Sequence, residues 1–86
     1  MTREITITNT LGLNASNAPQ LVQIANSFKC SIWLETEDRK ANAKSLLGVI
    51  SLGAKKDMSI VLIAEGFDAE EAIEKLSALI EKGFNK

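Results

Sequence analysis

The chain has 86 residues, of which 45% are hydrophobic and 24% charged, which is the composition of an ordinary small globular protein. Ten basic and eleven acidic residues give a net charge of −1, so no basic field is available to hold nucleic acid, and no apolar run approaches the roughly 20 residues of a membrane span. The absence of histidine excludes His-based catalytic triads, His metal ligands and phosphohistidine, and the single cysteine, Cys30, excludes an internal disulfide. We therefore expect no metal ion and no cofactor.

The first predicted element is a strand over residues 3–8. Ile5 and Ile7 alternate with threonines, the pattern of a half-buried strand. Because this pattern begins almost at Met1, we expect no signal peptide and a cytoplasmic protein.

A polar loop over residues 9–16 leads into the first predicted helix. Its apolar positions recur at helical spacing; they are Ala18, Leu21, Val22, Ala25 and Phe28. Pro19 lacks a backbone N–H and belongs in the first turn, so the N-cap is expected at Ser16 or Asn17 and not at Asn14.

A predicted hairpin follows, with strands over residues 31–36 and 40–43 joined by a polar turn at 37–39. Ile32 and Leu34 share one face of its first strand, and Trp33 lies on the other. The sequence leaves open whether that second face is covered.

A short helix is predicted between Ser45 and Gly53. The serine hydroxyl is a preferred N-cap acceptor, and glycine readily takes the left-handed conformation that ends a helix. A two-turn helix cannot bury side chains on every face, so some of Leu46, Leu47 and Ile50 should remain at the surface. We expect the exposed pair to be Leu46 and Leu47.

The last two elements are a strand over residues 58–64 and a helix over 69–80. The strand is almost continuously apolar, as expected for an interior strand. Asp68 and Glu71 have the spacing of a capping box at the start of the helix, and Gly83 is expected to close it.

This order of elements, β-α-β-β-α-β-α, predicts an α+β fold in one domain spanning residues 1–86. The economical arrangement is a four-stranded antiparallel sheet with three helices on one face. A ferredoxin-like arrangement is the nearest alternative.

The whole chain resembles the HPr family, the small phosphocarriers of the bacterial sugar phosphotransferase system. Residues 43–53, Ala-Lys-Ser-Leu-Leu-Gly-Val-Ile-Ser-Leu-Gly, are similar to the regulatory-serine segment of that family. Residues 65–72 are similar to its entry into the final helix. The resemblance implies the HPr-like open-faced β-sandwich and a protein that is not an enzyme.

The loop that corresponds to the family's active site departs from its pattern. Residues 12–18 read Gly-Leu-Asn-Ala-Ser-Asn-Ala, so Asn14 stands where the resemblance implies the phosphate-accepting histidine. Ser16 replaces the arginine and Asn17 the proline. An amide nitrogen is not a usable nucleophile, so Asn14 cannot accept a phosphoryl group. We therefore expect that this chain is not a histidine phosphocarrier. The three residues could still form an anion site at the helix N-terminus, or serve only as caps and turn formers.

For Ser45 the resemblance implies phosphorylation by an HPr kinase/phosphorylase. A phosphoserine would lie at the positive end of a helix, with Lys44 as an adjacent counter-charge. Leu46, Leu47 and Ile50 would then dock on a partner such as a LacI-type catabolite-control repressor. By its sequence pattern alone, Ser45 could also be an unmodified N-cap, and the leucines could be core residues.

Two further functions remain open. The chain could be an interaction module that binds Enzyme I or a sugar permease subunit without any phosphate. It could also be an altered phosphocarrier of sugar transport. In none of these roles is nucleic acid or a membrane a direct partner.

Overall fold

A computed structural model of the chain describes residues 1–84. Its elements in chain order are β1 (Thr2–Thr6), α1 (Ala18–Asn26), β2 (Ser31–Glu35), β3 (Lys40–Asn42), α2 (Leu46–Ser51), β4 (Ser59–Glu65) and α3 (Ala69–Glu81). This is the predicted order of elements. Within residues 1–84, no helix combines the length and the hydropathy that a membrane span requires.

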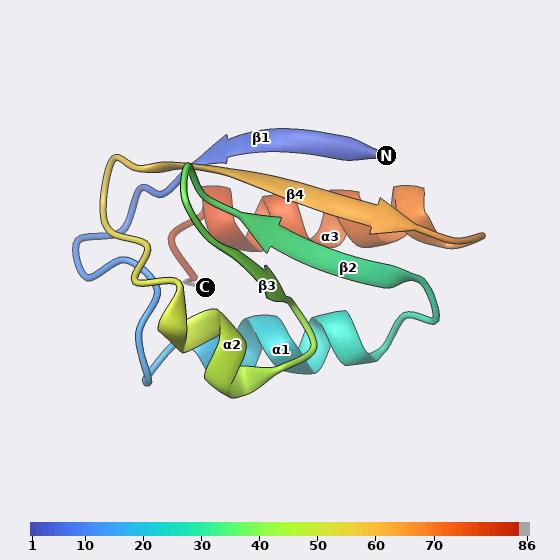
Figure 1. Cartoon of the computed structure of the whole chain (residues 1–86), viewed down its shortest axis with the longest axis horizontal. Helices are drawn as coiled ribbons and strands as arrows, with labels where there is room; N and C mark the ends of the chain where they lie inside the picture. Colours follow the sequence, from blue (N-terminus) through green and yellow to red (C-terminus); the bar gives the residue numbers. More distant parts are fainter. Residues whose placement is uncertain (85–86) are drawn as a thin grey trace.

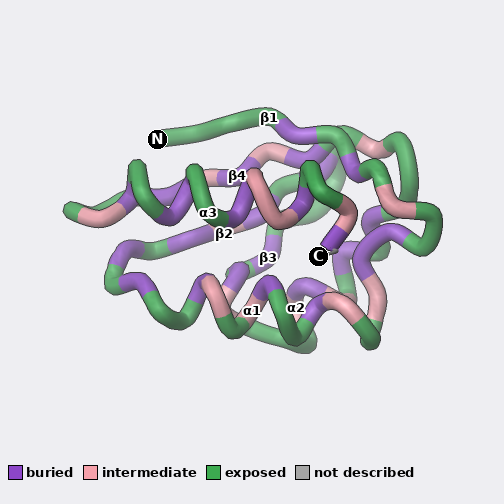
Figure 2. Tube along the Cα trace, turned by 180° about the vertical axis from the view of Figure 1, so that it is seen from behind, coloured by how far each residue is buried: buried purple, intermediate pink, exposed green. Residues whose placement is uncertain are grey.

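The four strands form one antiparallel sheet in the order β1-β4-β2-β3 (Figure 1). The central strand β4 pairs with β1 on one side and with β2 on the other. Its apolar sequence follows from this position, as predicted. Seen from behind, α1 and α3 lie in front of the sheet, and buried residues recur along both layers (Figure 2). The predicted four-stranded sheet with helices on one face is thus confirmed.

The strand residues that face the helices form the core of the molecule. In register, Ile5 lies opposite Ile60, and Leu62 lies opposite Leu34 of β2. All four side chains are at most 2% exposed. The alternation of side chains along each strand brings them to the same face, where they pack against α1 and α3.

Three strands are shorter than the sequence predicts, and one of them, β2, ends at Glu35, one residue early. Strand β1 ends at Thr6, although Ile7 is fully buried and still exchanges backbone hydrogen bonds with Asp57 and Met58. Asp57 has a left-handed φ of +74°, which turns the chain out of the ladder there. Strand β3 ends at Asn42 because its carbonyl already accepts the N–H of Ser45.

The uncovered face of the sheet carries Trp33, whose side chain is half-buried. The Nζ of Lys40 lies 5.2 Å from the centre of the indole ring, within the range of a cation–π contact. The tryptophan is therefore partly shielded by a strand neighbour and not by a helix.

The predicted capping box at the start of α3 is wrong. Asp68 occupies the N-cap position, but its side chain makes no hydrogen bond to the helix. Its carboxylate accepts the backbone N–H groups of Lys29 and Cys30 instead, each at 2.9 Å. These donors hold the pKa of the carboxyl below its usual value, with Lys29 as the largest contributor. Asp68 thus ties the start of α3 to the segment that precedes β2.

The predicted end of α3 at Gly83 is confirmed. Gly83 has a φ of +71°, and its N–H bonds to the carbonyl of Ile80 at 3.0 Å. The N–H of Phe84 reaches back to Leu79, also at 3.0 Å. These two bonds form a Schellman motif, which satisfies carbonyls that the helix end would otherwise leave unpaired.

Candidate functional site

Ser45 is the N-cap of α2, as the sequence predicts. Its backbone is extended, with φ −107° and ψ 115°, and its Oγ accepts the N–H of Gly48 at 3.1 Å. The serine is exposed. A Cβ atom at position 48 would lie only 3.2 Å from this Oγ, so the glycine leaves room around the hydroxyl.

The apolar residues of α2 divide between the core and the surface. Val49 is fully buried, and Ile50 is half-buried. Leu46 is 43% exposed and Leu47 74% exposed, so the expected exposed pair is confirmed. These two leucines form an apolar surface directly after the exposed serine. Their role in docking stays a prediction.

Lys44 has a structural partner of its own. Its Nζ donates to the carbonyl oxygen of Phe28 at 2.7 Å, and its carbonyl accepts the side-chain amide of Asn26 at 3.1 Å. The residue thus ties the entry of α2 to the end of α1. The structure directs the ammonium toward Phe28, whereas the sequence suggested a counter-charge beside Ser45.

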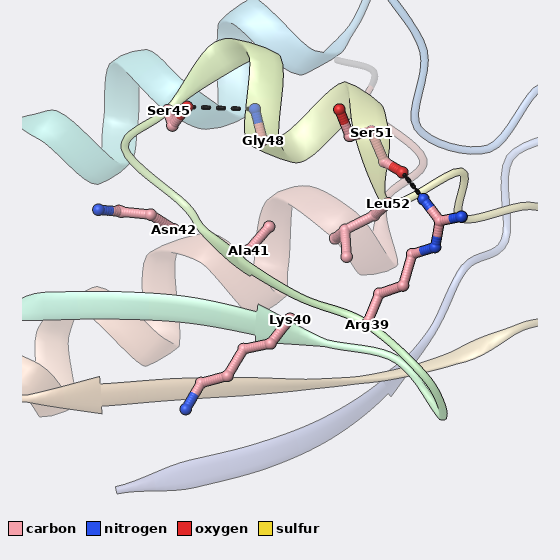
Figure 3. Close-up of a pocket in the computed structure, with 8 residues that line it drawn as sticks. All are labelled: Arg39, Lys40, Ala41, Asn42, Ser45, Gly48, Ser51 and Leu52. Carbon is pink, nitrogen blue, oxygen red and sulfur yellow. Dashed lines mark hydrogen bonds between the residues drawn. The ribbon is translucent and has the colours of Figure 1, made fainter.

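An open cavity of about 550 Å³ lies between α2 and β3. It is lined by Arg39, Lys40, Ala41, Asn42, Ser45, Gly48, Ser51 and Leu52 (Figure 3). At one end, Nη1 of Arg39 donates to the carbonyl of Ser51 at 2.9 Å and so satisfies the C-terminal end of α2. At the other end lies the Ser45 hydroxyl.

The sequence predicts only a polar turn around Arg39 and does not indicate this role. The contact spans 12 residues and exists because β3 runs alongside α2. A basic residue in a turn gives no local signal for such a partner. Lys40 also lines the cavity, but its side chain points away from it (Figure 3), and its ammonium lies over Trp33 on the outer face of the sheet.

In the loop before α1, Asn14 is the main acceptor. Its Oδ1 accepts the N–H of Ser16 at 2.8 Å, the hydroxyl of Ser16 at 2.9 Å and the N–H of Asn17 at 3.1 Å. Its backbone carbonyl accepts the N–H of Ala18 at 2.9 Å. The N–H groups of Ser16, Asn17 and Ala18 are therefore already bonded within the loop. This arrangement supports the interpretation as caps and turn formers over that of an anion site.

Asn17 is the positional N-cap of α1, as predicted, with Pro19 in the first turn. However, its side chain does not cap the helix. Its Oδ1 accepts the N–H of Asn14 at 3.0 Å, and its Nδ2 donates to the carbonyl of Gly12 at 2.7 Å. The position of Pro19 predicts that Asn14 is not the cap, yet the Asn14 side chain is the one that accepts the N–H groups of this turn. The difference arises because one further turn of chain precedes the helix.

Cys30 is buried at the junction between α1 and β2. Its side chain is 3% exposed, and burial, followed by the neighbouring Asp68 carboxylate, raises the pKa of the thiol. Such a thiol is less reactive than a free one because the thiolate is disfavoured. Among residues 1–84, no group of three or more His, Cys, Asp or Glu side chains could hold a metal ion.

The sequence matches a family profile described as the PTS HPr component phosphorylation site over residues 1–82. The chain belongs to the HPr family. It is 42% identical to the HPr-like protein Crh of Bacillus subtilis over 71 residues, which cover 83% of this chain and 84% of Crh. It is 40% identical to the phosphocarrier protein HPr of Xylella fastidiosa over 83 residues, covering 96% and 93% of the two chains.

The fold agrees with solved structures of the same family. The crystal structure of HPr-C-His from Thermoanaerobacter tengcongensis superposes with a TM-score of 0.94 at 43% identity, covering 100% of this chain and 97% of that one. The HPr-like open-faced sandwich is thereby confirmed, and the ferredoxin-like alternative is wrong. This HPr-like protein of the phosphotransferase system nevertheless contains no histidine.

Proposed function

We propose that this member of the HPr family is a regulatory protein of carbon catabolite control and that phosphorylation of Ser45 switches it. The observation that carries the proposal is the exposed, uncrowded Ser45 hydroxyl at the start of a helix whose next two side chains are exposed leucines. The protein would act in the cytoplasm as a binding partner without catalytic activity of its own.

Phosphorylation of Ser45 would change both charge and hydrogen bonding at the start of α2. A phosphoserine carries a charge of about −2 and three strong acceptor oxygens. The N–H of Gly48, which now bonds the serine Oγ, is one donor within reach of that group. An anion at an exposed helix N-terminus gains up to about 1 kcal/mol. The modification is therefore compatible with the fold.

The docking surface of this proposal consists of Leu46, Leu47 and Ile50. The first two lie beside Ser45 in the chain, so a partner that contacts them would also meet the phosphate. A LacI-type repressor is the proposed target of the phosphorylated form, and an HPr kinase/phosphorylase is the modifying enzyme. The bond from Lys44 to Phe28 would have to open for that ammonium to contribute.

The loop around Asn14 supports a function other than phosphate transfer. An amide cannot accept a phosphoryl group as a histidine does, and no arginine stands at position 16 to clamp one. The hydrogen bonds from Ser16 and Asn17 to Asn14 also leave few donors for an anion. An altered phosphocarrier is for these reasons the weaker alternative.

Intact mass spectrometry after two separate incubations tests the proposal. One incubation contains Enzyme I and phosphoenolpyruvate, and the other contains HPr kinase and ATP. We expect one added phosphate in the second only, lost in Ser45→Ala and retained in Ser51→Ala, which alters another exposed serine of the same helix. A phosphate from phosphoenolpyruvate, or none from the kinase, would contradict the proposal.

The exposure of Leu47 without any phosphate favours a second candidate function, a constitutive module that binds Enzyme I or a sugar permease subunit. If the chain is such a module, the wild type and Ser45→Ala should inhibit phosphotransfer between authentic partners to the same extent. Leu47→Ala would weaken the inhibition. No inhibition at high concentration would exclude this function.

A further inference from the structure

A second surface lies at the start of α3, at the end of the molecule's long axis away from α2 (Figure 1). It is a groove of about 680 Å³ lined by Phe67, Asp68, Glu70, Glu71, Glu74 and Lys75. Neither the loop that carries Asn14 nor the helix that Ser45 caps contributes a residue to this groove. The groove therefore has no part in the function proposed above.

Phe67 is the most exposed of the large hydrophobic side chains in the described part of the chain, at 86%. Such exposure of an aromatic ring is unfavourable for stability alone, because the fold forgoes the burial of its apolar area. Aromatic side chains are also enriched among the residues that dominate binding energy at protein interfaces. The ring is thus a candidate anchor.

The turn that displays Phe67 is fixed on both sides. Before it, Gly66 presses against Cys30 so closely that a Cβ atom at position 66 would lie 2.7 Å from the Cβ of Cys30. After it, the Asp68 carboxylate holds the N–H groups of Lys29 and Cys30. A rigid turn loses little conformational entropy when a partner binds, which favours affinity.

The residues that line the groove carry an excess of negative charge. Four acidic residues, Asp68, Glu70, Glu71 and Glu74, line it, and Lys75 is the single basic residue among its lining, which leaves three negative charges in excess. The whole chain carries only −1. The negative charge would repel nucleic acid and anionic membranes. A guanidinium or ammonium group could instead pair with a carboxylate and lie over the aromatic face of Phe67.

We propose that Phe67, Glu70, Glu71 and Glu74 form a docking surface for a basic segment of a partner protein. That segment would carry arginine or lysine side chains together with at least one apolar side chain. The cations would pair with the glutamates and stack on the ring, and the apolar side chain would cover it. Binding here does not depend on Ser45 or on its phosphorylation.

The test is a titration of the full chain with the peptide Ac-Arg-Leu-Arg-Arg-Leu-Arg-NH2. The backbone amide NMR shifts of the protein are measured at each peptide concentration. We expect shift changes concentrated at residues 66–75 and a loss of affinity of about fivefold or more in Phe67→Ala, as for a hot-spot residue. A triple variant with Glu70, Glu71 and Glu74 changed to Gln should lose affinity by at least as much.

A matched triple variant controls for charge alone. A separate hollow on the face of the sheet that the helices leave uncovered is lined by Glu4, Glu35 and Glu37. Changing these three residues to Gln alters the net charge by the same amount. This control and Ser45→Asp should bind the peptide as the wild type does. Equal loss in both triple variants, shifts spread over the whole surface, or unchanged affinity in Phe67→Ala would overturn the proposal.

Discussion

Gly12 and Gly53 have nearly the same left-handed backbone, with φ of +66° and +63°, but very different surroundings. A Cβ atom at Gly53 would meet nothing within 4 Å. At Gly12 it would overlap the Ala54 carbonyl oxygen and lie 2.7 Å from the Cα of Lys55. The neighbouring N–H of Leu13 bonds that same carbonyl at 2.9 Å. The loop carrying Asn14 is thus pressed directly onto the chain that leaves α2.

This pair of glycines gives a matched prediction for stability. Gly53→Ala should cost about 1–2 kcal/mol, the strain of a left-handed alanine. Gly12→Ala should cost a further 1–3 kcal/mol or so, because the backbone must also move apart. Urea unfolding followed by the fluorescence of Trp33, the only tryptophan, measures both. Equal losses would show that the loop is not held against Ala54.

Among the elements, α3 depends on a contact made outside itself. The Asp68 carboxylate accepts the N–H groups of Lys29 and Cys30 and thereby joins the start of α3 to the segment between α1 and β2. Because the pKa of this group is lower in the folded protein than in the unfolded chain, its ionised form stabilises the fold. That contribution is present above the unfolded pKa, about 4, and is lost as the pH falls through the folded pKa.

We therefore expect the wild type to lose stability between neutral pH and about pH 3 more steeply than Asp68→Asn does. The asparagine cannot ionise, so its contribution does not change with pH. Urea unfolding at the two pH values measures the difference between their slopes. Asp38→Asn removes a carboxylate from the exposed β2–β3 turn and should retain the wild-type slope. Identical slopes for the wild type and Asp68→Asn would contradict this role.

At the scale of the whole molecule, stability depends on the single interface between the sheet and its helices. Leu62 lies in the central strand and is fully buried in that interface, whereas Leu47 of α2 is 74% exposed. The two leucines differ in environment and not in chemistry. They allow the contribution of the core to be separated from that of the proposed docking surface.

Leu62→Ala should cost about 2–5 kcal/mol, through lost burial and the cavity left behind. Leu47→Ala should change stability by no more than about 0.5 kcal/mol, as surface substitutions do. The same urea unfolding experiment measures both. If Leu47→Ala proves strongly destabilising, its side chain packs on the fold, and losses of binding in that variant could not be assigned to docking.

The sequence by itself determined the order and type of every element, because alternation in strands, helical spacing and caps are local properties. It located the N-cap at Ser45, the helix ends at Gly53 and Gly83, and the exposed pair Leu46 and Leu47, all of which the structure confirms. The absence of histidine is likewise a matter of composition, and it excludes phosphohistidine without any structure.

Only the tertiary structure decided which partners the polar side chains choose. Asp68 bonds a segment 38 residues away and not its own helix, and Arg39 reaches the end of α2. Within the loop before α1, the side chain of Asn14 accepts the N–H of Asn17, and the side chain of Asn17 accepts the N–H of Asn14. The position of the two residues before the helix does not predict this exchange. A carboxylate, guanidinium or amide can satisfy its hydrogen bonds locally or at a distance at similar free energy. The packing of the elements settles that choice, because it fixes which unpaired backbone groups lie within reach.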